Sequence, residues 1–152
     1  YVEATSNYPS KTFRLTLVAN LTAAFHSTFG LRVEKKPDMS LSSEEMALRH
    51  SLMAEENDEY LEAVRAGDMV EVADALGDML YILCGTIVSH GMQDVMGDVF
   101  RTIQASNMSK LGPDGRPIYR ADGKVLKGPG YFKPDIAGAL RDAGVELSSA
   151  AS

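Results

Sequence analysis

Two groups of acidic residues could carry chemistry in this chain. The first is the run Glu55-Glu56-Asn57-Asp58-Glu59, and the second lies twelve residues further on, between Glu71 and Asp78. At helical spacing the acids of both groups continue stripes that are otherwise apolar, so we expect them on the inward faces of two helices. Several inward carboxylates need a counter-charge, because burying an unpaired charge costs several kcal/mol. No basic residue stands where it would neutralise them all, so the pattern predicts a hard divalent cation.

The acids differ in the alternatives that remain open. Asp58 and Glu62 fall off the shared stripe and are predicted to be solvated surface residues. Glu71 follows Asp68 by three residues, so it either binds the metal or completes a capping box at the start of the helix. Asp74 lies where aspartate is a poor helix former, which favours a functional role. If the helical phase is shifted by one residue, an exposed acidic patch replaces the inward stripe formed by Glu55, Glu56 and Glu59.

The ligand types narrow the choice of metal. The candidate ligands are all carboxylates, which suit Mg²⁺ or Mn²⁺. The three histidines lie outside both acidic groups, which disfavours zinc, and no Glu-x-x-His motif of a di-iron bundle accompanies the acids. Magnesium and manganese usually contact the protein through carboxylates and the substrate through phosphates. A polyphosphate substrate is therefore expected.

The acids belong to the second and third of four predicted helices. Apolar spacing and glycine stops predict helices over 12–29, from Ser42 or Ser43 to Ala66, from Asp68 to about His90, and over 93–109. Ser42 and Glu45 are spaced as a capping box. The short Gly67-Asp68 connection predicts an antiparallel pair, which would bring both acidic halves together near the turn.

The chain changes character after the fourth helix. Residues 111–134 hold five glycines and four prolines, and six basic residues lie there when Lys110 is included. Asp122-Gly123 predicts the turn of a small hairpin, and a short helix is predicted from Asp135 to about Ala143. The basic side chains of this loop could neutralise the phosphate charge that metal ions leave uncompensated. An ordinary solvated loop is the alternative.

Composition limits the classes of protein. The 152 residues predict one domain over 12–143, with a flexible N-terminus over 1–11 and a disordered tail over 144–152. The net charge of −6 argues against nucleic-acid binding. The single cysteine, Cys84, is predicted to be an inert core residue in a reducing compartment, the cytoplasm (of the host, if a bacteriophage encodes the chain). No membrane partner is expected, since the apolar run Met79–Val88 is about half a span.

That same run predicts self-association. Met79, Leu80, Ile82, Leu83, Ile87 and Val88 cover every face of the third helix, which is more than one helix pair can bury. We therefore expect a homodimer or a homotetramer.

The chain resembles the all-α nucleoside triphosphate pyrophosphohydrolase superfamily, the MazG-like and phosphoribosyl-ATP pyrophosphohydrolase-like group. The superfamily signature is Glu-Glu-x-x-Glu on one helix, matched here by Glu55-Glu56-x-x-Glu59, and Glu-x-x-Asp on the next, matched by Glu71-x-x-Asp74. Many members run the second motif directly into a segment like Leu76–Tyr81, with a Glu three residues before its Asp. Alanine stands at that position here, so the ligand pair from this helix is either Glu71 with Asp74 or Asp74 with Asp78.

Further motifs extend the resemblance to about residues 20–138. They are similar to a single-domain subgroup that includes deoxyuridine triphosphatase-like enzymes, and a related bacteriophage branch acts on deoxyguanosine triphosphate. The matching stretches are Phe25-His26-x-x-Phe29-Gly30, Asn107-Met108-Ser109-Lys110, Arg120-Ala121-Asp122-Gly123-Lys124 and Gly130-Tyr131-Phe132-x-Pro134-Asp135.

The resemblance implies an all-α, four-helix MazG-like bundle whose C-terminal segment closes over the substrate phosphates. It implies hydrolysis of a (d)NTP to a (d)NMP and pyrophosphate, with dUTP or dGTP as possible substrates. Glu55 or Glu56 would accept a proton from the attacking water. Two or three Mg²⁺ or Mn²⁺ ions would be held by Glu55, Glu56, Glu59, Glu71, Asp74 and Asp78. The substrate would contact Asn107, Lys110, Arg120, Lys124, Tyr131 and His26, although His26 on an apolar helix has a structural role as its alternative.

Two other functions stay open at this point. One is stepwise removal of orthophosphate from the γ end of a nucleotide, and the other is a non-catalytic oligomer that binds a nucleotide and regulates a partner. The first product separates all three, because it is pyrophosphate, orthophosphate or nothing.

Overall fold

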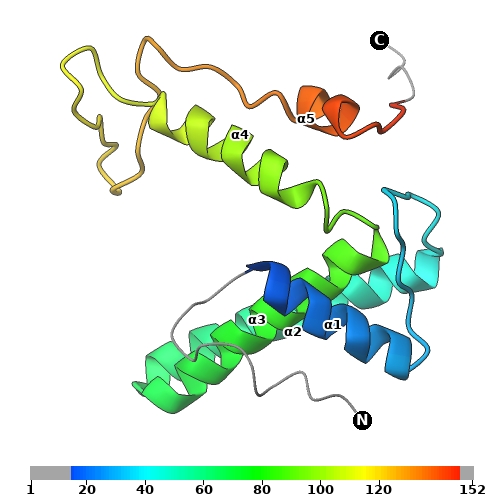
Figure 1. The fold of residues 1–152 in the computed structure, drawn as a ribbon. Helices are drawn as coiled ribbons and strands as arrows, with labels where there is room; N and C mark the ends of the chain where they lie inside the picture. Colours follow the sequence, from blue (N-terminus) through cyan, green and yellow to red (C-terminus); the bar gives the residue numbers. More distant parts are fainter. Residues whose placement is uncertain (1–14, 148–152) are drawn as a thin grey trace. The chain divides into compact units, whose positions relative to one another are not determined.

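The computed structural model describes residues 15–147, which contain five α-helices and no β-strand (Figure 1). The predicted all-α class is confirmed. These residues divide into two compact units, the first ending at Gln93 and the second beginning at Asp94. The helices are α1 (Leu15–Thr28), α2 (Ser43–Ala66) and α3 (Met69–Ser89) in the first unit, and α4 (Met96–Met108) and α5 (Ile136–Asp142) in the second.

In the first unit α3 contacts both other helices. It packs against α2 and against α1, and small residues at the contacts let the helix axes approach closely. On α3 these include Ala75, Cys84 and Gly85, and on α2 Ala63 is buried. The predicted burial of Cys84 is confirmed, since its side chain is fully buried. By length and composition alone, α3 could cross a membrane. Core helices of soluble proteins share that property.

The ends of α2 form as the sequence predicts. Ser42 and Glu45 make a reciprocal capping box, in which Glu45 N donates to Ser42 Oγ at 3.1 Å and Ser42 N donates to Glu45 Oε2 at 2.7 Å. Gly67 ends the helix with φ of 69°, a left-handed conformation that costs glycine no steric strain. The capped ends fix where the acidic turns of α2 begin and stop.

The segment between α1 and α2 is tied to the end of α3. Glu34 N donates to Val88 O at 3.0 Å, and Asp38 N donates to His90 O at 2.9 Å. Arg32 pairs with Glu34 and Asp38 on the same segment. This connection therefore stabilises the end of the α2–α3 pair that lies far from the Gly67 turn.

Two observed helices differ in their bounds from the predicted ones. Of the predicted helix 12–29, residues 12–14 lie outside the described part, and α1 ends at Thr28. The predicted helix over 93–109 begins later, at Met96, and the amide of Gln93 instead donates to Glu34 O at 2.7 Å. Of the proposed flexible ends, 1–11 and most of 144–152 also lie outside the described residues.

The second unit holds α4, a long loop and α5, with α5 packed on α4. The predicted hairpin forms at Asp122-Gly123, where Tyr119 and Val125 make one antiparallel bridge and Arg120 N donates to Lys124 O at 2.8 Å. Asp135 caps α5 as predicted, accepting from Gly138 N at 2.7 Å.

Candidate functional site

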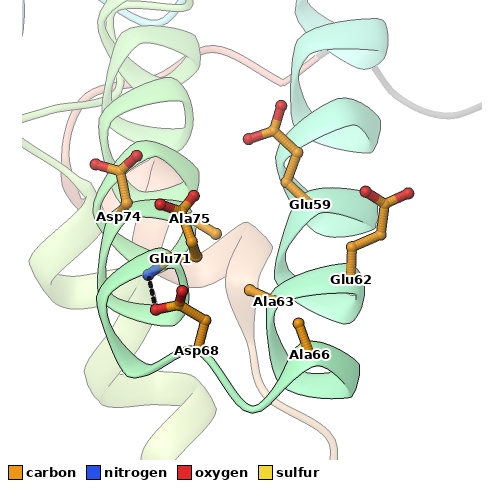
Figure 2. A pocket seen from close by; sticks show the side chains of 8 residues that line it. All are labelled: Glu59, Glu62, Ala63, Ala66, Asp68, Glu71, Asp74 and Ala75. Carbon is orange, nitrogen blue, oxygen red and sulfur yellow. Dashed lines mark hydrogen bonds between the residues drawn. The ribbon is translucent and has the colours of Figure 1, made fainter.

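Some of the acidic residues of α2 and α3 line a pocket beside the turn that joins these helices, whereas Glu55, Glu56 and Asp78 are not among its lining residues. Its volume is about 440 Å³. Figure 2 shows side chains from both helices around it, with the carboxylates of Glu59 and Asp74 on opposite walls. Alanines form the floor between the helices, where Ala63 and Ala75 are buried. The lining residues are Glu59, Glu62, Ala63, Ala66, Asp68, Glu71, Asp74 and Ala75.

Glu56 has the most unusual surroundings of the predicted site residues. Its side chain is half-buried, and its Oε2 atom is buried with no hydrogen-bond partner in the described part of the chain. Burial raises the pKa of the Glu56 carboxyl, and so do four neighbouring carboxylates, in the order Glu59, Asp78, Glu55 and Asp74. The fold therefore brings four of the predicted acids, from two helices, near the buried oxygen of a fifth.

The expectation that all these acids face inward is wrong for the unit described by itself. Glu56 alone is half-buried, whereas the other candidates are exposed: Glu55, Glu59, Glu71, Asp74 and Asp78. The physical reason is that α2 and α3 pack through small residues such as Ala63 and Ala75. The longer acidic side chains consequently border the contact and do not fill it.

Glu71 does not complete a capping box. Asp68 caps α3 by accepting from Val70 N at 2.9 Å and from Glu71 N at 3.2 Å, and Figure 2 shows the second of these bonds. The Asp68 N–H, which the Glu71 carboxylate would have to satisfy in a capping box, donates to Ala63 O at 3.1 Å. The Glu71 carboxylate lines the pocket instead.

Glu62 also lines the pocket, beside Glu59. It is exposed, as predicted, but the sequence reasoning did not include it in the site because it falls off the Glu55–Glu59 stripe. Its spacing of three residues after Glu59 was the available signal, since side chains three apart are neighbours on a helix.

The donor set fits a hard divalent cation. Within residues 15–147 no three His, Cys, Asp or Glu side chains already converge closely enough to hold an ion. The buried Glu56 oxygen and its four neighbouring carboxylates nevertheless offer the oxygen ligands that Mg²⁺ and Mn²⁺ take. A bound cation would also relieve the repulsion between these like charges.

His26 lies inside the first unit. Its side chain is 3 % exposed, and its Nδ1 is hydrogen-bonded to Arg32 O at 2.8 Å. This placement favours the structural alternative over a contact with the substrate base, because the ring is already enclosed and bonded.

The other predicted substrate residues lie in the second unit, and most already have partners. Lys110 Nζ donates to Asn107 Oδ1 at 2.8 Å, and Arg120 Nε donates to Asp122 Oδ1 at 2.9 Å. The pairing raises the pKa of Arg120 and lowers that of Asp122. The sequence predicted Asp122 as a turn residue but not as the partner of Arg120.

Tyr131 has a cationic partner, because Lys127 Nζ lies 4.4 Å from the centre of its ring. Lys124 is exposed near the hairpin turn. The loop that carries these residues is closed at its base, where Gly128 N donates to Lys110 O at 2.9 Å. A Cβ at Gly128 would overlap Leu111 O, so the two segments at the base of the loop approach too closely for any other residue.

Comparison with known proteins identifies the family. The model of the phosphoribosyl-ATP pyrophosphohydrolase (PRA-PH) family matches residues 22–107, which include all six candidate acids. No curated protein matches the chain. Among solved structures, a protein of Exiguobacterium sp. 255-15, provisionally described as an NTP pyrophosphohydrolase, is similar at 26% identity and a TM-score of 0.46, over 88% of this chain and 98% of that one. Since the family match covers more than half of the 152 residues, the chain belongs to the phosphoribosyl-ATP pyrophosphohydrolase family and is a hydrolase of the nucleotide pyrophosphatase class.

Proposed function

We propose that the chain is a metal-dependent (deoxy)nucleoside triphosphate pyrophosphohydrolase, which converts a (d)NTP and water into a (d)NMP and pyrophosphate. Possible substrates are dUTP and dGTP. The observation that carries the proposal is the half-buried Glu56 with its unpartnered oxygen and four surrounding carboxylates, on two helices that the family match includes.

The acids would hold the cofactor. Glu55, Glu56, Glu59, Asp74 and Asp78 are the proposed ligands of two or three Mg²⁺ or Mn²⁺ ions, and the pocket position of Glu71 keeps it a further candidate. Ions bound there supply Lewis-acid chemistry, by neutralising phosphate charge and acidifying a water molecule.

Glu56 is suited to accept the proton of the attacking water. Before an ion binds, burial and the neighbouring carboxylates raise the pKa of the Glu56 carboxyl, which makes it a stronger proton acceptor than an ordinary carboxylate. The water oxygen bonds to the α-phosphorus, the bond from that phosphorus to the bridging oxygen breaks, and pyrophosphate leaves with the bridging oxygen. Glu55 is the alternative base.

Cationic side chains of the loop would stabilise the leaving pyrophosphate. Lys110 is held by Asn107 and is therefore oriented before substrate binds. Arg120 would have to exchange its carboxylate partner, Asp122, for a phosphate. Lys124, which is exposed on the same hairpin, needs no such exchange of its side chain.

The test is to identify the first product. A panel of canonical and non-canonical triphosphates is incubated with Mg²⁺ and, separately, with Mn²⁺ in ¹⁸O-labelled water. The proposal requires equal amounts of pyrophosphate and of a monophosphate that carries the label. Orthophosphate as the first product would establish stepwise hydrolysis, and nucleotide binding without turnover would establish a regulatory protein.

The apolar surface of the α2–α3 pair supports a homodimer or homotetramer. A groove of about 320 Å³ is lined by Met53, Met79, Leu80 and Leu83. Leu76 and Leu83 are 50% and 47% exposed, which is unusual for large apolar residues on a helix that packs in a core. We propose that a second copy of the chain covers this surface, with no nucleic-acid or membrane partner.

A further inference from the structure

Arg49 of α2 is a half-buried arginine that contacts the backbone of α3. Its Nε donates to Thr86 Oγ1 at 3.1 Å, and its Nη2 donates to Ile82 O at 2.8 Å. The Thr86 hydroxyl donates to the same carbonyl at 2.9 Å. No ion pair of Arg49 occurs in the described residues, although five ion pairs of other side chains do. The guanidinium is therefore held by α3 itself and not by a counter-charge.

Gly85 provides the space for this contact. A Cβ at Gly85 would lie 2.7 Å from Arg49 Nη2 and 2.8 Å from His26 Nε2. Such distances are too short for packed atoms, so the guanidinium reaches Ile82 O only because residue 85 has no side chain. Arg49, Gly85 and His26 come from α2, α3 and α1, and their contact joins all three helices of this unit.

The spacing along the two helices links this contact to the acidic site. Seven residues separate Arg49 from Glu56 on α2, and seven separate Asp78 from Gly85 on α3. Seven residues are about two turns, or about 10 Å, and bring a side chain back to nearly the same face. Because α2 and α3 run antiparallel, the contact of Arg49 at Gly85 sets Glu56 opposite Asp78.

We propose that Arg49 is a positioning residue: its bonds to Ile82 and Thr86 fix the register of α2 on α3, and with it the separation of the carboxylates that receive the cation. The effect of this register on metal binding rests on the proposed function. The register itself is a property of the chain and can be measured without metal.

Two substitutions perturb the contact in different ways. Arg49→Met removes the guanidinium, whereas Gly85→Ala keeps it and displaces it from Ile82 O. Both should weaken Mn²⁺ binding, measured by calorimetry without nucleotide, by about tenfold or more, as loss of an outer-shell support does. Arg49→Lys should recover only part of the affinity, because one ammonium group cannot reproduce the two fixed donors. Arg101→Met, which removes an exposed arginine of α4, should leave the affinity unchanged.

A metal-free measurement reports the register directly. Spin labels at cysteines replacing the exposed Asp58 and Ala73 report the distance between α2 and α3, and Cys84 is too buried to take a label. Gly85→Ala should shift that distance by up to about 1.5 Å, the rise of one residue along a helix axis.

The outcomes are decisive in each case. An unchanged distance and unchanged Mn²⁺ affinity in folded Gly85→Ala would overturn the proposal, as would full recovery by Arg49→Lys. If Arg49→Met does not fold, Gly85→Ala alone decides. If the unsubstituted protein binds no Mn²⁺, the proposed function fails, while the distance measurement still tests the role of Arg49.

Discussion

At the scale of single residues, Glu56 is the group on which the proposed chemistry depends. Its neighbours Glu55 and Glu59 are exposed and can turn towards water, but one oxygen of Glu56 is buried and has no hydrogen-bond partner among residues 15–147. A buried, unsatisfied carboxylate oxygen destabilises the fold unless a ligand satisfies it. Such a cost is expected at a functional site and is difficult to explain elsewhere.

Glu56→Gln should lower turnover by at least about a hundredfold, the usual contribution of a general base. The amide has nearly the same shape as the carboxyl, so the helix content measured by circular dichroism should stay the same. Asp58→Asn is the matched control, because Asp58 is exposed and is not among the carboxylates that surround Glu56. Retained turnover of the Gln variant at saturating magnesium would contradict the assigned role.

The raised pKa of Glu56 also predicts how stability depends on pH. In the folded, metal-free protein this carboxyl takes up its proton at a higher pH than in the unfolded chain, where its pKa has the ordinary value of about 4.5. The protein should therefore gain stability as pH falls from above the folded pKa towards the unfolded one, and lose it as pH rises.

Urea unfolding of the wild type and of Glu56→Gln, measured in parallel with a chelator present, isolates this contribution. The Gln variant should be the more stable above the folded pKa, and the difference should shrink as the pH is lowered. A difference in the free energy of unfolding that does not change with pH would show that folding does not raise the pKa of Glu56.

The residue types and spacing predicted which acids the fold gathers, but not the partners of each side chain. The Asn107–Lys110 bond and the Arg120–Asp122 pair depend on side-chain rotamers, which residue types and spacing do not determine. His26 shows the same limit, because its burial follows from the packing of α1 on α3 and not from its own helical pattern.

At the scale of elements, the turn between α2 and α3 decides where the acids meet. Gly67 adopts φ of 69°, and Asp68 begins the next helix immediately. Both features were predictable, because glycine and aspartate at a helix junction have strong local preferences. The later start of α4 was not, since it depends on the distant bond between Gln93 and Glu34.

Two glycine substitutions should change stability in opposite directions. Gly67→Ala forces a side chain into a left-handed conformation and should destabilise the protein by about 1–2 kcal/mol. Gly77→Ala, in the interior of α3 with open space around it, should stabilise by about 0.5–1 kcal/mol. Urea unfolding of both variants checks the prediction, and equal effects would show that the turn conformation contributes nothing.

At the scale of the whole molecule, the apolar groove on α2 and α3 predicts assembly. If a second copy covers Leu83, then Leu83→Asp should give monomers without unfolding the chain, because this leucine is already 47% exposed in the single unit. Sedimentation velocity measures the state of assembly. Met39→Asp, at a residue that is 76% exposed in the segment before α2, is the control and should assemble normally. A Leu83→Asp protein of unchanged mass would place the interface elsewhere.

The whole candidate cation site comes from one short stretch of chain. All its candidate carboxylates lie between Glu55 and Asp78. This stretch belongs to a single helical hairpin that is capped at Ser42 and turns at Gly67. Contacts this local close small loops and form rapidly in folding. If the hairpin binds the proposed cation, it can do so before the segment beyond residue 93 has folded, and added divalent ions are then expected to act on an early step of folding.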